Sequence, residues 1–284
     1  MSQDKRIIYI MGGGRSGTTI TDIVLGNAEG AESLGELFRF PELRGKPHGF
    51  KKDTDCAIFW KKINNEFLDG VPYSLERLEK VAHSIEYHSK FFKTYYGLNS
   101  SENIKVYKNY VNNFFDCTFN NVTSNLLIDS SMYPGRAIAL SKFLEYPISF
   151  IYMRRDPSSV VASYQKKNVE QPSKSPFWAT SYYFLINLIC KVASNYLKRN
   201  GFKVIDIRYE DLILEPFSTL FRIESNLEID LKRVKKIIEN DGHLKVGNLL
   251  EGNRIRLKDK IKLRRTLNTS GTKYLLNKLN YIFY

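Results

Sequence analysis

Short apolar stretches recur along the chain, separated by longer polar or mixed segments. Four of them are rich in β-branched or aromatic residues and lead into turn or helix-start signals: residues 6–11, 125–129, 148–153 and 203–209. Continuous apolar runs of this length are typical of strands buried on both faces of a parallel sheet. We therefore predict four buried parallel strands.

Helical patterns follow the first three of these strands. Apolar residues recur at helical spacing at Ile20, Ile23 and Val24, across residues 137–144, and at Val160, Val161 and Tyr164. Strands that alternate with helices form a doubly wound parallel sheet. The predicted fold class is α/β, a three-layer sandwich in which helices flank a central parallel sheet.

Residues 38–120 carry a different pattern, with aromatic-rich helical segments and few strand signals. We expect this helical insertion to shape an acceptor pocket, because ligands of such folds bind in the crevice at the carboxyl ends of the strands. A chain of 284 residues can bury a sizeable core. We expect residues 1–284 to form a single domain.

The chain is strongly basic, with a formal net charge of +13. Such an excess implies an anionic partner: a nucleotide, an acidic glycan, nucleic acid or a membrane. Much of it lies in a basic C-terminal segment, residues 243–284, which includes Lys258, Lys260, Lys262, Arg264, Arg265, Lys273 and Lys278. Basic segments of this kind are more often solvated faces than ligand sites.

Cysteine content and hydropathy bear on the compartment. Cys56, Cys117 and Cys190 are odd in number and lack a C-x-x-C spacing, which argues against a disulfide framework or a zinc ribbon. The N-terminus resembles a strand more than a signal peptide, and the longest apolar stretch, residues 182–190, is too short to span a bilayer. We expect a soluble, cytoplasmic protein.

A glycine-rich loop, residues 12–19, follows the first predicted strand and is called the phosphate loop below. It reads Gly-Gly-Gly-Arg-Ser-Gly-Thr-Thr and leads into a helix that begins near Thr18. Glycines let backbone amides converge on a phosphate, and the helix N-terminus adds its dipole. The G-x-x-x-x-G spacing matches a Walker A loop, but Thr18 stands where that motif requires lysine. Arg15 and the hydroxyls of Ser16, Thr18 and Thr19 suit a phosphosulfate group, which needs no metal. The alternative is that the loop is only a tight turn between the strand and the helix.

A second candidate anion site follows the third predicted strand. Asp156 is a good N-cap and Pro157 a good first helical residue. Arg155, Ser159 and Ser163 then lie on one side of the helix, with Lys166 or Lys167 about a turn further. The alternative is a solvated helix with an ordinary cap. That alternative accounts for Lys166 and Lys167 better than it accounts for Arg155.

Together these two motifs resemble the sulfotransferase family that uses 3′-phosphoadenosine-5′-phosphosulfate (PAPS), in particular bacterial members similar to carbohydrate and tyrosylprotein sulfotransferases. The family's 5′-phosphosulfate loop resembles Gly14, Arg15, Ser16, Gly17, Thr18 and Thr19. Its 3′-phosphate motif, an Arg-Asp pair with a later serine, resembles Arg155, Asp156 and Ser163. The resemblance implies a P-loop-type fold, PAPS as co-substrate, no metal, and transfer of a sulfuryl group to a hydroxyl.

Three further segments extend the resemblance. Residues 208–212 are similar to a segment whose tyrosine, here Tyr209, touches the nucleotide. Residues 252–256 resemble a G-N-P-x-R loop that closes over PAPS, which implies roles for Asn253 and Arg256, although Arg254 replaces the proline. Residues 129–132 resemble a D-S-S-K pattern in which Met132 stands in place of the lysine. Arg15, Arg136 or a residue of the C-terminal segment are candidates to supply the missing cation.

The transfer also requires a base, because the attacking hydroxyl loses its proton as the new bond forms. Related enzymes that act on sugars or tyrosine have a Gly-Glu pair after the first helix, and the resemblance implies Glu36 as the catalytic base and Arg15 as a catalytic cation. Glu36 could instead be a surface residue or pair with Arg15 or Arg39. The other candidates for the base are Glu32, Glu42, His48, His83, His88 and His243.

The function predicted from the sequence is sulfuryl transfer from PAPS to the hydroxyl of a carbohydrate, another glycan, a lipid or a small alcohol. A nucleotide kinase is the first alternative, which the missing lysine disfavours. A non-enzymatic anion-binding protein is the second. We expect no nucleic-acid partner, because no stacking-aromatic or helix-turn-helix pattern is present.

Overall fold

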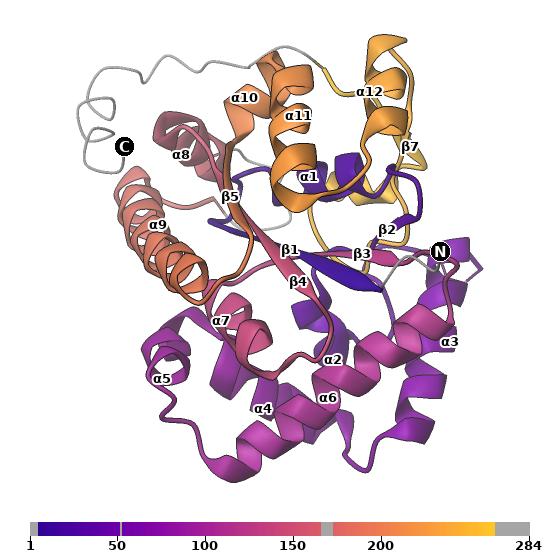
Figure 1. Ribbon diagram of the computed structural model, residues 1–284. Coiled ribbons are helices and arrows are strands. Elements are labelled where there is room, and N and C mark those ends of the chain that lie inside the picture. Colours follow the sequence, from indigo (N-terminus) through magenta and orange to yellow (C-terminus); the bar gives the residue numbers. More distant parts are fainter. Residues whose placement is uncertain (1–4, 52, 166–172, 265–284) are drawn as a thin grey trace.

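A five-stranded parallel sheet forms the centre of the protein (Figure 1). The computed structural model describes residues 5–51, 53–165 and 173–264. The strand order is β2-β3-β1-β4-β5, and every neighbouring pair is parallel. The strands are β1 (Arg6–Gly12), β2 (Ala31–Ser33), β3 (Leu126–Met132), β4 (Ile148–Arg154) and β5 (Val204–Arg208). The predicted fold class is confirmed.

Two features of the sheet differ from the prediction. The hydrophobic pattern misses β2, because this strand is three residues long and carries Glu32 at its centre. β3 continues beyond the predicted end into a polar stretch, whose side chains find partners inside the protein. Ser130 Oγ donates a hydrogen bond to Asp22 Oδ2 at 2.6 Å, and Ser131 Oγ donates one to Asp129 Oδ1.

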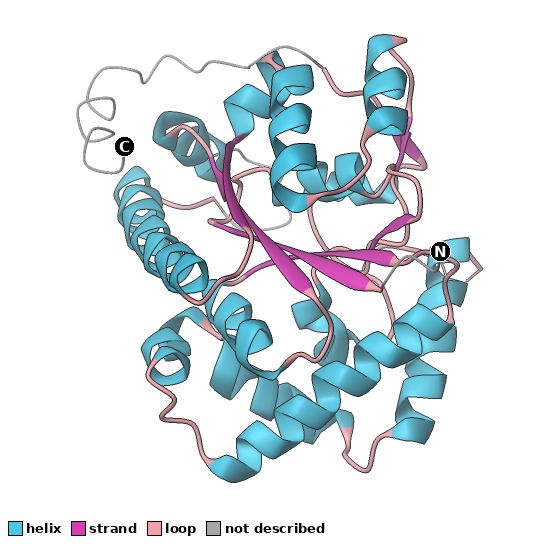
Figure 2. Ribbon diagram, in the orientation of Figure 1, coloured by secondary structure: helices cyan, strands magenta, loops and turns pink. Residues whose placement is uncertain are grey.

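The side chains of β1 alternate between two hydrophobic cores, as expected for a strand covered on both faces. Ile7, Tyr9 and Met11 belong to one core, and Ile8 and Ile10 belong to the other. Figure 2 shows helices on both sides of the sheet. The sheet is therefore the middle layer of a three-layer sandwich.

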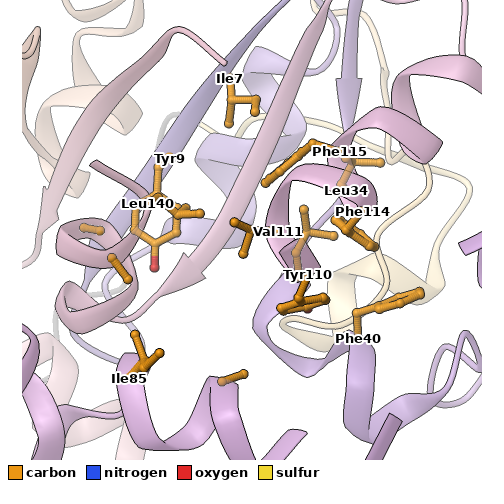
Figure 3. Packing of buried hydrophobic residues seen from close by; sticks show 14 of the residues in the cluster. Ile7, Tyr9, Leu34, Phe40, Ile85, Tyr110, Val111, Phe114, Phe115 and Leu140 are labelled. Carbon is orange, nitrogen blue, oxygen red and sulfur yellow. The ribbon is translucent and has the colours of Figure 1, made fainter. Parts of the chain in front are cut away.

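The first core lies between the sheet and the helices that include the region 38–120. These helices are α2 (Phe40–Leu43), α3 (Asp55–Gly70), α4 (Leu75–Glu86), α5 (Phe91–Tyr95), α6 (Ser101–Asn120), α7 (Pro134–Phe143) and α9 (Pro176–Arg199), with the short 3-10 turns η1 (Leu37–Arg39) and η2 (His88–Lys90). Figure 3 shows Phe40 and Phe114 in this core, where their ring centroids are 4.6 Å apart. Most of residues 38–120 lie in helices α2 to α6.

The second core lies on the opposite face of the sheet. It is covered by α1 (Thr18–Leu25), α10 (Tyr209–Leu214), α11 (Pro216–Leu227), α12 (Lys232–Glu239) and the antiparallel pair β6 (Leu244–Lys245) and β7 (Lys260–Ile261), with η3 (Arg254–Leu257) between those two strands. The remaining helix, α8 (Pro157–Gln165), packs against α9.

The basic C-terminal segment is described as far as residue 264. Lys258, Lys260, Lys262 and Arg264 are exposed, as expected for a solvated face. Arg265, Lys273 and Lys278 lie outside the described residues. Across the described ranges, no helix combines the length and the apolar character needed to cross a membrane.

Candidate active site

A cavity of about 440 Å³ opens at the carboxyl edge of the sheet. Most of the residues that the sequence singles out meet on its wall: Gly14, Arg15, Gly17, Thr18, Thr19, Glu36, Arg155, Ser163, Tyr209 and Asn253. These residues come from segments that are far apart in the sequence. The parallel sheet brings them together, because the loops that follow its strands all emerge at one edge.

The phosphate loop connects β1 to α1 at the centre of this edge. Arg15 and Gly17 have positive φ values of 67° and 98°, so the chain turns sharply here. A Cβ atom on Gly17 would lie 2.4 Å from the Tyr209 ring, and one on Gly12 would lie 2.7 Å from the carbonyl oxygen of Met153. These glycines therefore allow a tight approach as well as the turn.

The second anion site lies directly beside the phosphate loop. Arg155 Nη1 donates a hydrogen bond to the carbonyl oxygen of Arg15 at 3.0 Å, and the Arg155 guanidinium lies 4.3 Å from the centre of the Tyr209 ring. Asp156 caps α8 as predicted, since its Oδ1 accepts from the amide of Ser159 at 3.0 Å. Ser163 reaches the cavity wall, whereas Ser159 does not line it.

Two predicted ligands lie away from the wall. The Ser16 side chain is buried, and its Oγ finds no hydrogen-bond partner among the described residues. Arg256 is 3% exposed and donates to Glu251 Oε1 through Nε at 3.0 Å and Nη2 at 2.6 Å. The geometry therefore gives Arg256 a place in a buried ion pair. Lys166 and Lys167 lie outside the described residues.

The loop that carries Asn253 closes over the start of α1. The backbone amide of Asn253 donates to Thr19 Oγ1 at 3.2 Å. Gly252 has a φ of 146°, and a Cβ atom there would lie 3.2 Å from the Thr19 side chain. The Asn253 side chain caps η3 by accepting from the amide of Ile255 at 3.2 Å. This loop thus contacts Thr19 of the phosphate loop.

Glu36 reaches the cavity from the turn after β2. Its backbone amide donates to the carbonyl oxygen of Glu251 at 3.1 Å, and no described residue forms an ion pair with its carboxylate. Arg39 pairs with Glu42 instead, at 2.7 Å. Burial raises the pKa of Glu36 to about 8; the Glu251 carboxylate adds to this rise, while Arg39 and Arg256 oppose it. Glu36 is therefore poised to exchange a proton near neutral pH.

The other candidate bases differ in whether they line the cavity. Glu32 accepts a hydrogen bond from Asn248 Nδ2 at 3.0 Å, and neither it nor Glu42 lines the cavity. His48 pairs with Glu251 at 2.7 Å, His83 stacks on Phe38 with centroids 5.5 Å apart, and His243 lines a second cavity beside α12. These contacts leave His88 as the histidine on the wall of the first cavity, within the described residues.

His88 lies against the residues that follow β3. Its ring stacks on Tyr133 with centroids 4.3 Å apart. Burial lowers the pKa of His88 to about 4, and its Nδ1 has no hydrogen-bond partner in the described part of the chain. Met132, with a φ of 61°, and Tyr133 both line the cavity next to it. His88 is therefore a neutral histidine at neutral pH.

Arg136 is not available to replace the lysine that Met132 lacks. It is 1% exposed, with Nε 2.9 Å from Asp129 Oδ2 and Nη1 2.5 Å from Glu86 Oε1. Both carboxylates are fully buried, so this arginine neutralises charge inside the core. The expectation that Arg136 supplies a cation to the site is wrong. Among the described residues on the wall, the basic side chains are Arg15 and Arg155.

Aromatic residues of α8 and α9 complete the wall. Tyr164, Trp178 and Tyr182 line it, and Tyr182 OH accepts a 3.4 Å hydrogen bond from the amide of Gly14. The sequence pattern predicts Tyr164 as a core residue and gives the other two no role. Trp178 and Tyr182 stand four residues apart and so share a helix face, which is the signal that could have pointed to them.

The described part of the chain shows no metal centre near these residues. The described ranges contain no group of three His, Cys, Asp or Glu side chains placed to hold a metal ion. On the cavity wall, the Arg155 guanidinium carries a positive charge and its Nε has no hydrogen-bond partner among the described residues. A guanidinium with unused hydrogen-bonding capacity fits an anionic ligand.

The known proteins to which this chain is similar are sulfotransferases. The chain is similar in structure to the sulfotransferase domain of the Synechococcus PCC 7002 olefin synthase, with 17% identity, a TM-score of 0.41, and coverage of 82% of this chain and 77% of that domain. It is also similar to a sulfotransferase from Mycobacterium tuberculosis, with 14% identity, a TM-score of 0.47, and coverage of 82% and 70%. No curated protein sequence matches the chain. The profile of the sulfotransferase family matches residues 8–233, so the chain belongs to the sulfotransferase family.

Proposed function

We propose that this protein transfers the sulfuryl group of PAPS to a hydroxyl oxygen. The observation that carries the proposal is the hydrogen bond from Arg155 to the carbonyl oxygen of Arg15, which joins the two anion sites on one cavity wall. PAPS carries a phosphosulfate on its 5′ carbon and a phosphate on its 3′ carbon, so it needs two such sites close together. The two anion sites on one cavity wall support the proposal.

The donor half of the cavity consists of the phosphate loop, Arg155, Ser163 and Tyr209. The loop amides and the start of α1 would hold the 5′ end, because amides at a helix N-terminus favour anions. Arg155 and Ser163 would hold the 3′-phosphate through charge-assisted hydrogen bonds. Tyr209, whose ring lies against Gly17 and under the Arg155 guanidinium, lines the cavity between the two sites and would contact the nucleoside.

PAPS supplies the reactive sulfur when it is bound, and the protein supplies positioning, a base and charge stabilisation. Glu36 accepts the proton of the attacking hydroxyl. Arg15 and the phosphate-loop amides stabilise the negative charge that develops on the departing phosphate. With Arg136 buried in the core, Arg15 takes the role that a lysine at Met132 would have.

His88 is the second candidate for the base, because it also lines the cavity and burial keeps it neutral. We favour Glu36, because it follows β2 at the carboxyl edge, next to the phosphate loop, and no ion pair with a described residue holds its carboxylate. The two candidates differ in pKa, about 8 against about 4, so the pH dependence of the rate distinguishes them.

Transfer of radiolabelled sulfate from PAPS to a panel of hydroxyl acceptors tests the proposal. We expect label on at least one acceptor, at a rate that EDTA leaves unchanged. Thermal-shift titrations should show stabilisation by adenosine 3′,5′-bisphosphate and none by ATP with Mg²⁺. Stabilisation by ATP with Mg²⁺, without any by the bisphosphate, would instead support a kinase. Binding of polyanions with steep salt dependence and no transfer would support an anion-binding protein.

A further inference from the structure

The segment between β6 and β7 joins the turn of Glu36 to the phosphate loop. Its residues 251–253 are called the strap below. The amide of Glu36 donates a hydrogen bond to the carbonyl oxygen of Glu251 at 3.1 Å. Two residues further along the strap, the amide of Asn253 donates to Thr19 Oγ1 at 3.2 Å. The strap therefore contacts both the turn of the candidate base and the loop that would hold the donor.

The turn that carries Glu36 leaves little room for movement. Gly35 has a φ of 75°, and a Cβ atom there would lie 2.4 Å from the carbonyl oxygen of Glu251. The Gly35 amide donates to Asp22 Oδ2 at 3.0 Å, and the Gly35 carbonyl oxygen accepts from the amide of Ser130 at 2.9 Å. The backbone beside Glu36 is thus held by α1, β3 and the strap together.

The Glu251 carboxylate is held on both of its oxygens. Arg256 donates to Oε1 through Nε at 3.0 Å and Nη2 at 2.6 Å, the Gly252 amide donates to the same oxygen at 3.0 Å, and His48 Nδ1 lies 2.7 Å from Oε2. Burial raises the pKa of Glu251, but the hydrogen bonds from Arg256 and Gly252 outweigh burial, so the pKa lies below its ordinary value. Glu251 therefore carries a negative charge at neutral pH.

Glu251 has the largest effect on Glu36 among the charged groups nearby. Burial raises the pKa of Glu36 most, and the Glu251 charge adds to the rise, because two like charges in one site disfavour ionisation. The other titratable groups around Glu36 are Arg39 of η1, Asp129 of β3, Tyr133 after β3, Arg256 of η3 and His48 beside Glu251. Arg39 and Asp129 are paired with other residues. Glu251 and Arg256 therefore form the charge pair of the strap that acts on the base.

We infer that Glu251 is a positioning residue for the transfer, which fixes the turn of Glu36 and shields Glu36 from the charge of Arg256; this inference rests on the proposed function. The Arg256 Nη1 has no hydrogen-bond partner among the described residues. If the Glu251 charge were removed, the positive charge of Arg256 would act on Glu36 unopposed and make it a weaker base. Glu251 itself neither gains nor loses a proton, because the proton of the attacking hydroxyl passes to Glu36.

Two substitutions should move the base in opposite directions. Glu251→Gln removes the like charge, so the midpoint of the rising limb of kcat/KM should fall by about one pH unit or more. Arg256→Met removes a positive charge that opposes Glu251, so the midpoint should rise by about half a pH unit or more. Arg256→Lys keeps the positive charge and should stay closer to the wild type than Arg256→Met. A purely structural role would lower the rate in each variant without moving the midpoint in opposite directions.

Glu224→Gln is the matched control. Like Glu251, Glu224 accepts from a backbone amide, that of Leu231 at 3.1 Å, and pairs with a cation, Lys235 at 2.6 Å. It lies on α11 and does not line the cavity of the active site. The midpoint of Glu224→Gln should stay within about 0.2 pH units of the wild type, because the solvent screens a distant charge.

Carbon-13 NMR of the Glu36 carboxyl, assigned with Glu36→Gln, measures the pKa of Glu36 without reference to activity. A pKa that falls in Glu251→Gln and rises in Arg256→Met, with the rate midpoint following, supports the inference.

Transfer by the wild type together with an unmoved or higher pKa of Glu36 in Glu251→Gln overturns this inference alone. If Glu251→Gln does not fold, an unmoved or lower pKa in Arg256→Met overturns it. A rate midpoint that stays in place while the pKa moves overturns the assignment of Glu36 as the base and this inference with it. Absence of transfer by the wild type to every acceptor overturns the proposed function.

Discussion

Replacing Glu36 with glutamine tests the assignment of the base, because the amide keeps the shape of the side chain and cannot accept the acceptor proton. Loss of a general base typically slows a reaction by about 10²–10⁴-fold. Glu36→Gln should therefore lower kcat by at least about a hundredfold. Binding of adenosine 3′,5′-bisphosphate should stay within a few-fold of the wild type, because Glu36 lies outside the donor half.

The pH dependence of the wild-type kcat/KM gives the size of the effect expected from Glu36 ionisation. With a pKa of about 8, about a tenth of Glu36 is ionised at pH 7 and about nine tenths at pH 9, so kcat/KM should rise roughly tenfold. An ordinary glutamate, with a pKa of about 4.3, would be fully ionised at both pH values and would give a flat profile. If His88 is the base, the rising limb should instead lie near pH 4.

Stability should respond to the same group, with a sign that follows from the direction of the shift. Because burial raises the pKa of Glu36 in the folded protein, the native state binds more protons than the unfolded state between about pH 4.3 and 8. The contribution of Glu36 to stability therefore falls as the pH rises through this window. Each pH unit corresponds to at most about 1.4 kcal/mol, and partial exposure reduces the total to roughly 2–3 kcal/mol.

The assay combines initial rates from pH 6 to 9.5 with thermal denaturation over the same range. Relative to the wild type, Glu36→Gln should gain stability as the pH rises toward 8. It should also lack the rising limb in its residual rate. A wild-type rate that is flat across this range, or a variant of near wild-type rate, would refute the assignment of Glu36.

Two further predictions concern single positions, and a third concerns metal ions. Gly17→Ala should weaken adenosine 3′,5′-bisphosphate binding more than tenfold, because the new Cβ would lie 2.4 Å from the Tyr209 ring. The control is Gly97→Ala, at a similar positive φ of 72° with open space around it. It should cost only about 1 kcal/mol of stability and leave binding intact. Arg136→Met should destabilise the protein by about 3–5 kcal/mol, measured by urea denaturation, because it leaves two buried carboxylates without their counter-charge. Restored stability in the double variant with Glu86→Gln would confirm that cause. A loss of less than about 1 kcal/mol in Arg136→Met would contradict it. EDTA should leave the transfer rate within about 20% of its untreated value, and loss of activity that Mg²⁺ restores would contradict a metal-free mechanism.

Local residue patterns predicted those parts of the fold and the site that depend on local sequence. The buried strands of the sheet are marked by continuous apolar runs, and the phosphate loop is marked by glycines that the turn and the close approach of Tyr209 require. Arg155 could be placed beside the loop because both follow strands of one parallel sheet. Except for Asn253, which precedes η3, the predicted site residues that line the cavity follow strands of this sheet.

The features that were missed depend on tertiary contacts. β2 is too short to carry a hydrophobic pattern, and it exists because it pairs with β3. Arg136 lies on α7 near the end of β3, and nothing in the sequence shows that two buried carboxylates hold it. The aromatic part of the cavity wall, His88, Tyr133, Trp178 and Tyr182, comes from three distant segments, so no single motif could mark it.

Arg256 shows how a family motif can match while the geometry differs. Its guanidinium pairs with Glu251, five residues earlier, in a contact that the motif does not specify. Ile255 takes the position on the cavity wall next to Asn253. A basic residue in a loop that closes over a ligand can therefore stabilise the loop itself.

The most direct test of the account is the preference for a 3′-phosphate, measured by calorimetry with adenosine 3′,5′-bisphosphate and adenosine 5′-monophosphate. The wild type should prefer the bisphosphate by about 10- to 150-fold, as expected for charge-assisted hydrogen bonds. Arg155→Met should lose this preference while its affinity for the monophosphate stays within about threefold, and Arg199→Met, which removes an exposed arginine at the end of α9, should keep it. A full preference for the bisphosphate in Arg155→Met would contradict the claim that one nucleotide bridges the phosphate loop and Arg155.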